Sequence, residues 1–591
     1  MENSKIAALV ELGILCRGEA VSVHGDGTLD SGPHEYSAHN QFCRYEVPVY
    51  QRPFEDNSQA AYSLYEDGLT VEAAMAQTRL VIMLGVGDSV EMRSCLASPN
   101  TILVLFEPDD RALIKFLESI GLPLLNRKNL FCFTGDPYSF NPALQDLLPP
   151  DMFRQGTPAF FMTDRIRTDY GAWAARIIEY FEILHYRHVI YPLSGQSFMW
   201  SRPIRPIYRG LMYDQQLHAY ENVGDCLESP PIGHLHNIAS GLEAILVAAG
   251  PDLSEKFDFI RRNKNRAVII CVNNAIKPLV EAGIHPHFVI INDTSVESGR
   301  VFKHIPPLPE TVLVGHCLSD LGGEKFKKKF LFGSFVPEVF GQRKMLKLHG
   351  SVLSTAFSFA RHLGCRRCAL VGAQLASTNP WGLGYAKGTV KEGLTQESKP
   401  LINRHPQLYP VTTVFGEDLY TTMNFRDAAL WLAEAIRLSG VECVNTSKAS
   451  ILYGQGIEYD PDPDMGGGDI QRVMASLFKV ESPCVDRDNL RRYLRHEIAM
   501  WTSIKDAASA VLEDDSPAFL AKGMAILVQL DKNNVTNLVH RYANFRNILF
   551  HKKVFLGDET TRQEGLRYYF KNVCGMSNDF VQALKSAVRL V

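Results

Sequence analysis

The sequence predicts an α/β protein with a Rossmann-like N-terminal unit, a central α/β nucleotide-binding domain and a C-terminal α-helical domain. Short apolar runs alternate with helical patterns as far as about residue 375, which favours parallel strands covered by helices on both faces. A segment rich in Asp, Pro and Gly at 460–468 interrupts the chain. Beyond it, apolar residues recur at three- and four-residue spacing, as expected for helices.

The chain is long enough for several folding units, because its 591 residues exceed the ordinary size of one domain. We expect a hairpin region over residues 1–75, where turn-forming residues cluster at His24–Gly27 and Asp30–Pro33. A degenerate Rossmann-like domain should cover 76–214. The central domain should cover 215–460 and the helical domain 470–591.

The composition indicates an ordinary soluble protein. Hydrophobic residues make up 46% of the chain, and the net charge of −4 gives no general attraction to nucleic acid. Neither a leader pattern nor an apolar run long enough to span a membrane is evident, so we expect a cytoplasmic protein without a membrane span. Cys365-Arg366-Arg367-Cys368 lacks a second ligand pair in zinc-site spacing, and we expect no metal site.

The N-terminal unit shows the order strand, glycine turn, helix, strand and acid. Leu80–Leu84 is followed by Gly85-Val86-Gly87, and Ile102–Phe106 is followed by Glu107. This order is typical of a dinucleotide-binding fold, in which the acid can meet a ribose hydroxyl. Two glycines also serve tight packing of a helix on a strand, so both a structural role and a nucleotide site stay open.

The central domain should contain an anion site at the end of its first strand. The apolar run Ala244–Ala249 breaks into Gly250-Pro251 and should open a helix at once. Glycine lets a ligand approach the backbone, and the free amides of a first helical turn attract a phosphate. The alternative is a plain strand-to-helix turn, with Asp252 placed favourably against the helix dipole.

Polar residues follow the next two predicted strands. Asn273 and Asn274 come after Ala267–Val272, and Asn292-Asp293 comes after Phe288–Ile291. Side-chain amides at this position can contact a base, a ribose or a phosphate, and a carboxylate can accept a hydroxyl proton. Because the carboxyl ends of parallel strands share one edge, we expect these residues to line one crevice.

Two later segments should reach the same edge. Ser351 precedes a long apolar helix and is a good N-cap candidate, which would place free amides and a hydroxyl near the crevice. Gln374 follows the predicted strand Cys368–Val371. The segment from Ser377 to Pro410 is long and rich in Gly, Thr, Asn and Pro, so we interpret it as a lid or acceptor-binding flap.

Several of these motifs together resemble the central domain of the Maf family of motility-associated factors, which are flagellin glycosyltransferases. The matching stretches, in order, are Val247–Leu253, Asn273–Leu279 with Gly283–Pro286, Ile291–Asp293, Gly350–Val352, Leu363-Gly364, Val371–Ala376, Ala386–Thr389 and Asn445-Thr446. They lie within residues 240–455. The same domain resembles bacterial sialyltransferases that use a cytidine-monophosphate (CMP) sugar and, more distantly, an archaeal pterin diphosphokinase.

The resemblance implies transfer of a nonulosonic acid, such as pseudaminic or legionaminic acid, from its CMP form to Ser or Thr of flagellin. It implies a sialyltransferase-like central domain with CMP-nonulosonic acid and flagellin as partners, and no cofactor beyond the co-substrate. Carried over residue by residue, it assigns nucleotide binding to Gly250, Pro251, Asn273, Asn274, Ser351 and Gln374. Asp293 or Glu417 is the candidate catalytic base or sugar-orienting group.

The sequence departs from the family pattern at three positions. Asp252 replaces the usual serine, Ala373-Gln374 stands in place of Gln-Asp, and Tyr385 replaces a histidine. These departures keep two alternatives open. One is a non-catalytic flagellin-binding factor or chaperone, and the other is a diphosphokinase, which would need Mg²⁺ held by carboxylates such as those of Asp252 and Asp293.

Overall fold

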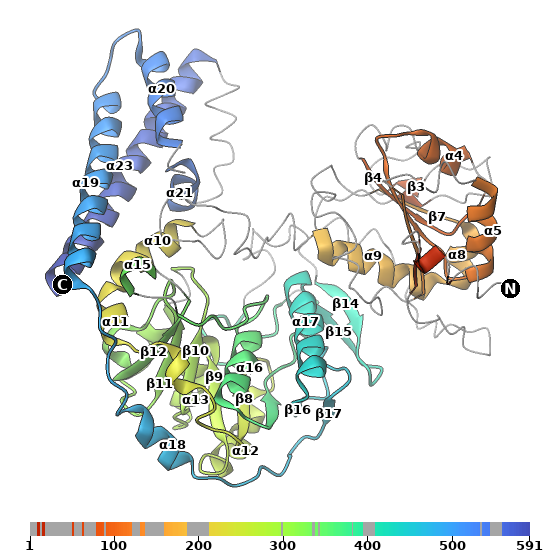
Figure 1. Ribbon diagram of the computed structural model, residues 1–591, viewed down its shortest axis with the longest axis horizontal. Helices are drawn as coiled ribbons and strands as arrows, with labels where there is room; N and C mark the ends of the chain where they lie inside the picture. Colours follow the sequence, from red (N-terminus) through yellow and green to blue (C-terminus); the bar gives the residue numbers. More distant parts are fainter. Residues whose placement is uncertain are drawn as a thin grey trace. The chain divides into compact units, whose positions relative to one another are not determined.

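The structure, a computed structural model, describes residues 79–87, 90–120, 130–135, 159–185, 212–296, 300–333, 337–340, 343–380, 382–393, 408–531, 535–543 and 558–591, with short pieces before residue 79 (Figure 1). The chain forms two compact units. One comprises Met1–Pro192 with Thr395–Tyr409, and the other comprises Leu193–Leu394 with Pro410–Val591.

The first unit is built on a parallel sheet with the strand order β1-β6-β5-β4-β7. Its strands are β1 (Leu15–Arg17), β4 (Leu80–Leu84), β5 (Ile102–Phe106), β6 (Leu130–Thr134) and β7 (Ala159–Met162). Its described helices include α4 (Val90–Ala97), α5 (Asp110–Ile120), α8 (Asp164–Asp169) and α9 (Gly171–His185). Strands β4 and β5 have the predicted bounds, since consecutive apolar residues buried on both faces specify a strand in such a sheet.

The N-terminal hairpin region needs a correction. Strand β1 pairs in parallel with β6 and forms an edge of the first sheet, whereas we expected hairpins over residues 1–75. An antiparallel pair does join β2 (Tyr50–Gln51) to β3 (Tyr62–Ser63). The predicted turns at His24–Gly27 and Asp30–Pro33 lie outside the described residues.

The second unit contains an eight-stranded sheet, parallel throughout, with the order β12-β11-β10-β9-β8-β13-β16-β17. The strands are β8 (Glu243–Val247), β9 (Val268–Val272), β10 (Phe288–Ile291), β11 (Val312–His316), β12 (Lys328–Phe332), β13 (Arg367–Val371), β16 (Glu442–Asn445) and β17 (Ile457–Tyr459). Strands β8, β9, β10 and β13 confirm the four strands predicted above for this domain. The chain order reverses between β8 and β13, and such a reversal is where doubly wound sheets form their ligand crevice.

Helices connect these strands and cover the sheet. They include α12 (Phe257–Arg262), α13 (Ile276–Glu281), α14 (Arg300–Lys303), α15 (Pro337–Phe340), α16 (Val352–Leu363) and α17 (Met423–Ser439). Helix α16 packs on β8, β9 and β10. It ends at Gly364, whose φ of 84° is a conformation that favours glycine. The hairpin β14 (Tyr409–Thr412) and β15 (Asp418–Thr421) leads into α17.

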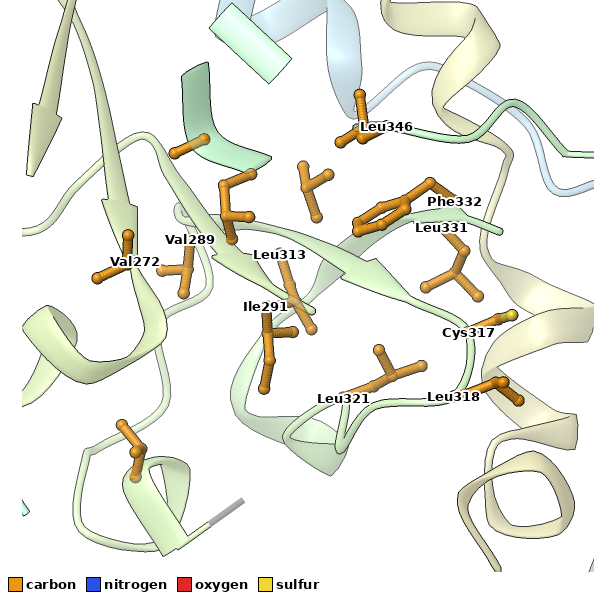
Figure 2. Packing of buried hydrophobic residues seen from close by; sticks show 14 of the residues in the cluster. Val272, Val289, Ile291, Leu313, Cys317, Leu318, Leu321, Leu331, Phe332 and Leu346 are labelled. Carbon is orange, nitrogen blue, oxygen red and sulfur yellow. The ribbon is translucent and has the colours of Figure 1, made fainter. Parts of the chain in front are cut away.

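The core of the second unit continues beyond the strands into the loops at their carboxyl ends. Figure 2 shows side chains of the β9–β12 strands, among them Val289 and Leu313, clustered with Leu318 and Leu321 from the segment after β11. These residues are at most 1% exposed. Burial of the loop side chains fixes the carboxyl edge of the sheet, because dense apolar packing leaves little freedom to the backbone that carries it.

The segment 460–468 contains no helix or strand, as predicted, but it is docked on the sheet domain rather than acting as a free linker. Arg262 and Arg266 form ion pairs of 2.5 and 3.0 Å with Asp462 and Asp464. The backbone N–H of Gly466 donates to Glu243 at the start of β8. Contacts with Arg262, Arg266 and Glu243 therefore hold the segment along the amino-terminal edge of the sheet.

The C-terminal part is helical, which confirms the prediction. Its helices include α18 (Ile470–Leu477), α19 (Arg487–Leu512), α20 (Phe519–Asp531), α21 (Val535–Tyr542) and α23 (Glu559–Leu590). Helices α19 and α23 lie side by side, and α10 (Met212–Glu221), which precedes the sheet, packs on α21 and α23 (Figure 1). Trp501 is fully buried and donates to the Tyr220 hydroxyl at 2.9 Å, so α10 joins the helical domain to the sheet domain.

Among the described helices, none combines the length and the apolar character that a membrane span requires.

Candidate functional site at the carboxyl edge of the sheet

The reversal point of the large sheet is formed by direct backbone contact between the segments after β8 and β13. The N–H of Gly250 donates to the carbonyl oxygen of Gly372 at 2.8 Å. A Cβ atom at position 250 would lie 2.3 Å from that oxygen, and Gly372 itself has a φ of 63°. Both positions therefore require glycine, and the predicted close approach at Gly250 is with the protein's own backbone.

The turn after Gly250 differs from the prediction. Pro251 lies in a turn and is exposed, and the next element is a 3-10 helix at Leu253–Lys256, before the six-residue helix α12. The predicted helix opening at Pro251 was wrong, because the chain must first turn away from the backbone of Gly372. So short an element has a weak dipole, and Pro251 marks the turn without supplying a helix N-terminus.

Asp252 points toward the segment after β16. One carboxylate oxygen accepts a hydrogen bond from the Ser447 hydroxyl, and the other has no partner among the described residues. Burial raises the pKa of the Asp252 carboxyl, although the Ser447 hydrogen bond opposes this shift. The departure at 252 therefore places a partly buried acid next to the reversal point, where it bridges two loops.

Asn273 and Asn274 open a short 3-10 helix directly after β9. The Asn273 side chain is fully buried, and neither its oxygen nor its nitrogen has a partner within the described part of the chain. The same is true of the side-chain oxygen of Asn274. A buried amide without partners costs free energy, so an unsatisfied group of this kind points to a ligand or a bound water.

Gln374 adds a third side-chain amide, after β13. It is 6% exposed, and its side-chain oxygen has no partner among the residues described. A Cβ atom at position 250 would be 2.0 Å from that oxygen. Gln374 therefore lies over the Gly250 turn. The next residue, Leu375, has a φ of 53°, a strained conformation for a leucine.

Asn292 and Asp293 follow β10, two strands away from β8, with β9 between them. The Asn292 amide donates to the Thr355 hydroxyl at 2.6 Å, and Asp293 accepts from the N–H of Ser295 at 3.0 Å. The sheet order confirms that β8, β9 and β10 present their polar residues at one edge. The same order places Asp293 farther from the reversal point than Asn273, Asn274 and Gln374.

Ser351 is the N-cap of α16, as predicted, since its hydroxyl accepts from the N–H of Leu353 at 3.2 Å. Its first turn lies next to the start of α17: a Cβ atom on Gly350 would be 3.4 Å from the carbonyl oxygen of Asn424. Thr421, just before α17, donates to the carbonyl oxygen of Leu375. Two longer helices, α16 and α17, thus begin at this edge. We expected the two helices that begin there to start at Pro251 and Ser351.

His349 and Asp427 form a pair that the sequence reasoning missed. The distance from His349 Nε2 to Asp427 Oδ2 is 3.0 Å, and Asp427 is fully buried. The His349 ring stacks on Trp431, with the ring centroids 4.9 Å apart. The position of His349, two residues before Ser351, was the one available signal, because Asp427 is 78 residues away within a helix.

Glu417 lies at the tip of the β14–β15 hairpin. Its carboxylate is 3.3 Å from the ammonium nitrogen of Lys448, which follows Ser447. Phe415 at the same tip packs against Tyr453, whose hydroxyl donates to the carbonyl oxygen of Ser447. The hairpin tip is thereby connected to the Asp252–Ser447 contact. Asp293 and Glu417 flank the edge from opposite sides of the reversal point, and the structure does not bring them together.

Residues 377–380 and 382–393 of the predicted flap pack on the Gly250 turn. The N–H of Ala386 donates to the carbonyl oxygen of Ala249 at 2.9 Å. The ring of Tyr385 contacts Phe425 in the first turn of α17, with centroids 6.1 Å apart. Tyr385 therefore stands between the turn and α17. Residues 381 and 394–407 of the flap lie outside the described residues.

The glycine turn of the first unit binds its own acid. Glu107 is fully buried and accepts from the N–H of Val86 at 3.0 Å and from the Arg165 guanidinium at 2.5 and 2.6 Å. Gly85 has a φ of 95°, and a Cβ atom there would be 2.4 Å from the Thr163 hydroxyl. These contacts favour the structural interpretation of this motif, because the acid that would meet a ribose is already satisfied.

The described residues include no group of three or more His, Cys, Asp or Glu side chains arranged to hold a metal ion. Cys365 and Cys368 are buried. His287 is also buried, which lowers its pKa to about 4, and its Nδ1 accepts from the N–H of Ile269 at 2.9 Å. The burial and contacts of Cys365, Cys368 and His287 therefore indicate a structural role for each of them.

Comparisons with known proteins give two findings. A family model described as 6-hydroxymethylpterin diphosphokinase MptE-like matches residues 217–380. Among solved structures, the chain is similar to a MAf glycosyltransferase from Magnetospirillum magneticum AMB-1, with 14% sequence identity and a TM-score of 0.42, over 87% of this chain and 78% of that one. None of the curated proteins matches this chain in sequence. The matched family region contains β8 to β13 and thus the whole reversal point.

Proposed function

We propose that the carboxyl edge of the large sheet binds a CMP-activated sugar and transfers the sugar to a hydroxyl group. The observation that carries this proposal is the buried side-chain amide of Asn273 together with the side-chain oxygens of Asn274 and Gln374, none of which has a hydrogen-bond partner among the described residues. Amides both donate and accept, and can therefore pair with the edge of a cytosine and with ribose hydroxyls. A bound nucleotide would satisfy groups that otherwise lower stability.

The leaving group in such a transfer is the phosphate of CMP. The bond between the anomeric carbon and the phosphate oxygen breaks, and the acceptor oxygen forms the new bond to that carbon. The N-terminus of α16, which Ser351 caps, carries the partial positive charge of a helix start and is the candidate contact for this anion. We propose no resident cofactor and no metal for this step.

The sugar and the acceptor follow from the resemblance in the sequence. We propose a nonulosonic acid of the pseudaminic or legionaminic type as the sugar, and Ser or Thr of flagellin as the acceptor, with the helical domain contributing to flagellin recognition. A transferase for flagellin would act before export, in the cytoplasm. Asp293 and Glu417 remain the candidate acids from the sequence for proton removal or sugar orientation.

Calorimetry and mass analysis together test this proposal. We expect CMP to bind the full chain with measurable heat, and Asn273→Ala to lose that heat. Flagellin co-expressed with the protein and a nonulosonic-acid pathway should gain the mass of the sugar, and Asp293→Ala should reduce the gain. Glu324→Ala, a change in a 3-10 helix outside this site, is the control. An unchanged flagellin mass with the wild-type protein would count against the transferase.

Two other functions make different predictions in the same experiments. A non-catalytic flagellin-binding factor binds flagellin but gives no heat with CMP. The family match favours a diphosphokinase, which would consume ATP with Mg²⁺ and a pterin alcohol. The structure does not bring these two carboxylates together for that metal, because Asp252 and Asp293 follow β8 and β10, with β9 between them, and Asp252 accepts a hydrogen bond from Ser447.

A further inference from the structure

We propose that His349 is the general base of the transfer reaction and that Asp427 is the residue that positions it. This inference rests on the proposed function and assigns its proton-transfer step to a pair of residues. His349 precedes the phosphate-binding turn of α16 by two residues, and its carbonyl oxygen accepts from the N–H of Ser351 at 2.5 Å. The imidazole and the helix N-terminus therefore belong to one rigid turn.

The geometry of the pair matches the requirements of a general base. Asp427 Oδ2 lies 3.0 Å from His349 Nε2, which makes Nε2 the protonated nitrogen when the ring is neutral. The other nitrogen, Nδ1, then has a lone pair available, and no described residue hydrogen-bonds it. The His349 side chain is 13% exposed, so most of the ring is protected from water while part of it remains accessible.

The surroundings hold the ring in one orientation. Trp431, one turn after Asp427 on α17, stacks on the imidazole with an interplanar angle of 11°. Gly350 adopts a φ of 57°, and a Cβ atom there would be 3.1 Å from Ala428, so the turn packs closely on α17. A catalytic group that is held by packing and by a hydrogen bond loses little freedom when the substrate binds.

The alternatives for the base are held less favourably. Glu417 is ion-paired with Lys448, and Asp293 accepts the N–H of Ser295, so each carboxylate is already engaged. The charged group facing His349 from α17 is Asp427, which stabilises the imidazolium that forms when a proton is taken up. Lys347, two residues before His349 on the segment that leads into α16, is exposed to solvent.

The step balances as follows. The acceptor hydroxyl loses its proton to Nδ1 of His349, and its oxygen forms the bond to the anomeric carbon of the sugar. The bond from that carbon to the phosphate oxygen breaks, and CMP leaves with the electron pair. The imidazolium, paired with Asp427, returns its proton to water after the products leave. No oxidant or further reactant is needed.

The test measures transfer from CMP-pseudaminic acid and CMP-legionaminic acid to flagellin, together with CMP binding by calorimetry. We expect His349→Ala to lower the transfer rate at least 100-fold, a size typical of the loss of a general base, while CMP affinity stays within threefold. Added imidazole should restore part of the rate. His234→Ala removes an exposed histidine elsewhere in the domain and should leave the rate unchanged.

Asp427→Asn should lower the turnover number without changing the KM for the donor, because Asp427 acts through His349. In the His349→Ala background the same change should have no further effect, since there is then no ring to position. Melting curves show whether each variant folds. The imidazole experiment uses only the His349→Ala variant. It therefore tests the inference even if Asp427→Asn does not fold.

The failures are distinguishable. If the wild-type protein transfers sugar and His349→Ala does so at a similar rate, this inference is wrong and the proposed function stands. If His349→Ala is folded and impaired but imidazole restores none of its rate, the inference is also wrong. If the wild-type protein neither binds CMP nor modifies flagellin, the proposed function fails and the inference fails with it.

Discussion

The side-chain oxygen of Gln374 lies so close over Gly250 that a methyl group at position 250 would come within 2.0 Å of it. The carbonyl oxygen of Gly372 would be only 2.3 Å away. The residue type at position 250 therefore determines whether the segments after β8 and β13 can meet at the reversal point of the sheet.

Gly250→Ala should destabilise the protein by about 1–3 kcal/mol, because the added methyl group forces apart two segments that are otherwise in contact. CMP binding should be lost with it. Chemical denaturation measures the first effect and calorimetry the second. Gly233→Ala is the matched control, since a Cβ atom there meets nothing within 4 Å. Equal stability of the two variants would contradict this account of the turn.

Asn273→Leu should separate stability from binding. The wild-type amide is fully buried and has no hydrogen-bond partner in the described part of the chain, so an apolar side chain of similar size should leave the melting temperature unchanged or raise it. CMP affinity should fall at least about tenfold, the equivalent of 1.4 kcal/mol.

Asn222→Leu is the contrasting control for that experiment. Asn222 is also buried, but its amide donates to the carbonyl oxygens of Cys317 and Ser319 at 2.9 and 2.7 Å. This variant should melt at a clearly lower temperature because it leaves two carbonyl groups unpaired. A large loss of stability in Asn273→Leu would show that Asn273 has a structural role.

Asp252→Asn should stabilise the protein at neutral pH more than at pH 4. Burial raises the pKa of Asp252 above its usual 3.8, so the folded state favours the protonated carboxyl group. The contribution of the protonated Asp252 carboxyl to the stability of the folded state is present at low pH. It is lost as the pH rises through the raised pKa. Asparagine carries no charge at any pH, and the difference in melting temperature should therefore grow from about pH 4 upward.

Melting curves over a pH series measure this difference. Asp258→Asn, in which the parent side chain is 86% exposed, should show no comparable trend. If the difference in melting temperature between Asp252→Asn and the wild type became smaller toward neutral pH, the prediction would be wrong.

Arg541→Ala should destabilise the protein by about 3–5 kcal/mol, because it leaves the buried carboxylate of Asp214 without its guanidinium partner. The Asp214 side chain is 1% exposed, and Arg541 Nη2 lies 2.7 Å from Asp214 Oδ2. Asp214 also accepts from the N–H of Val296, close to Asn292 and Asp293. Hydrogen exchange over 292–296 should therefore increase together with the loss of stability.

Arg437→Ala tests the same kind of change at the surface. Arg437 and Glu434 form an ion pair of 2.6 Å, but both side chains are about half exposed, so we expect little or no loss of stability. If the two arginine variants lost similar stability, burial of Asp214 would not be what makes the Arg541 contact important.

The strand pattern and the helical C-terminal part could be predicted from the sequence. Phe288–Ile291 has the predicted bounds because four consecutive buried apolar residues are a local signal. Ser351 was recognised as an N-cap for a similar reason, since the hydroxyl and the amide it caps are two residues apart. The turn at Pro251 was not predictable, because a residue far along the chain, Gly372, decides its direction.

The sequence by itself determined which residues form strands and helices and which polar groups follow each strand, because those properties depend on near neighbours in the chain. Only the tertiary structure decided which of these groups meet. Asp252 and Ser447 are 195 residues apart, and His349 and Asp427 are 78 apart, yet each pair is in contact. Parallel strand order and helix packing create these contacts, and no spacing along the chain encodes them.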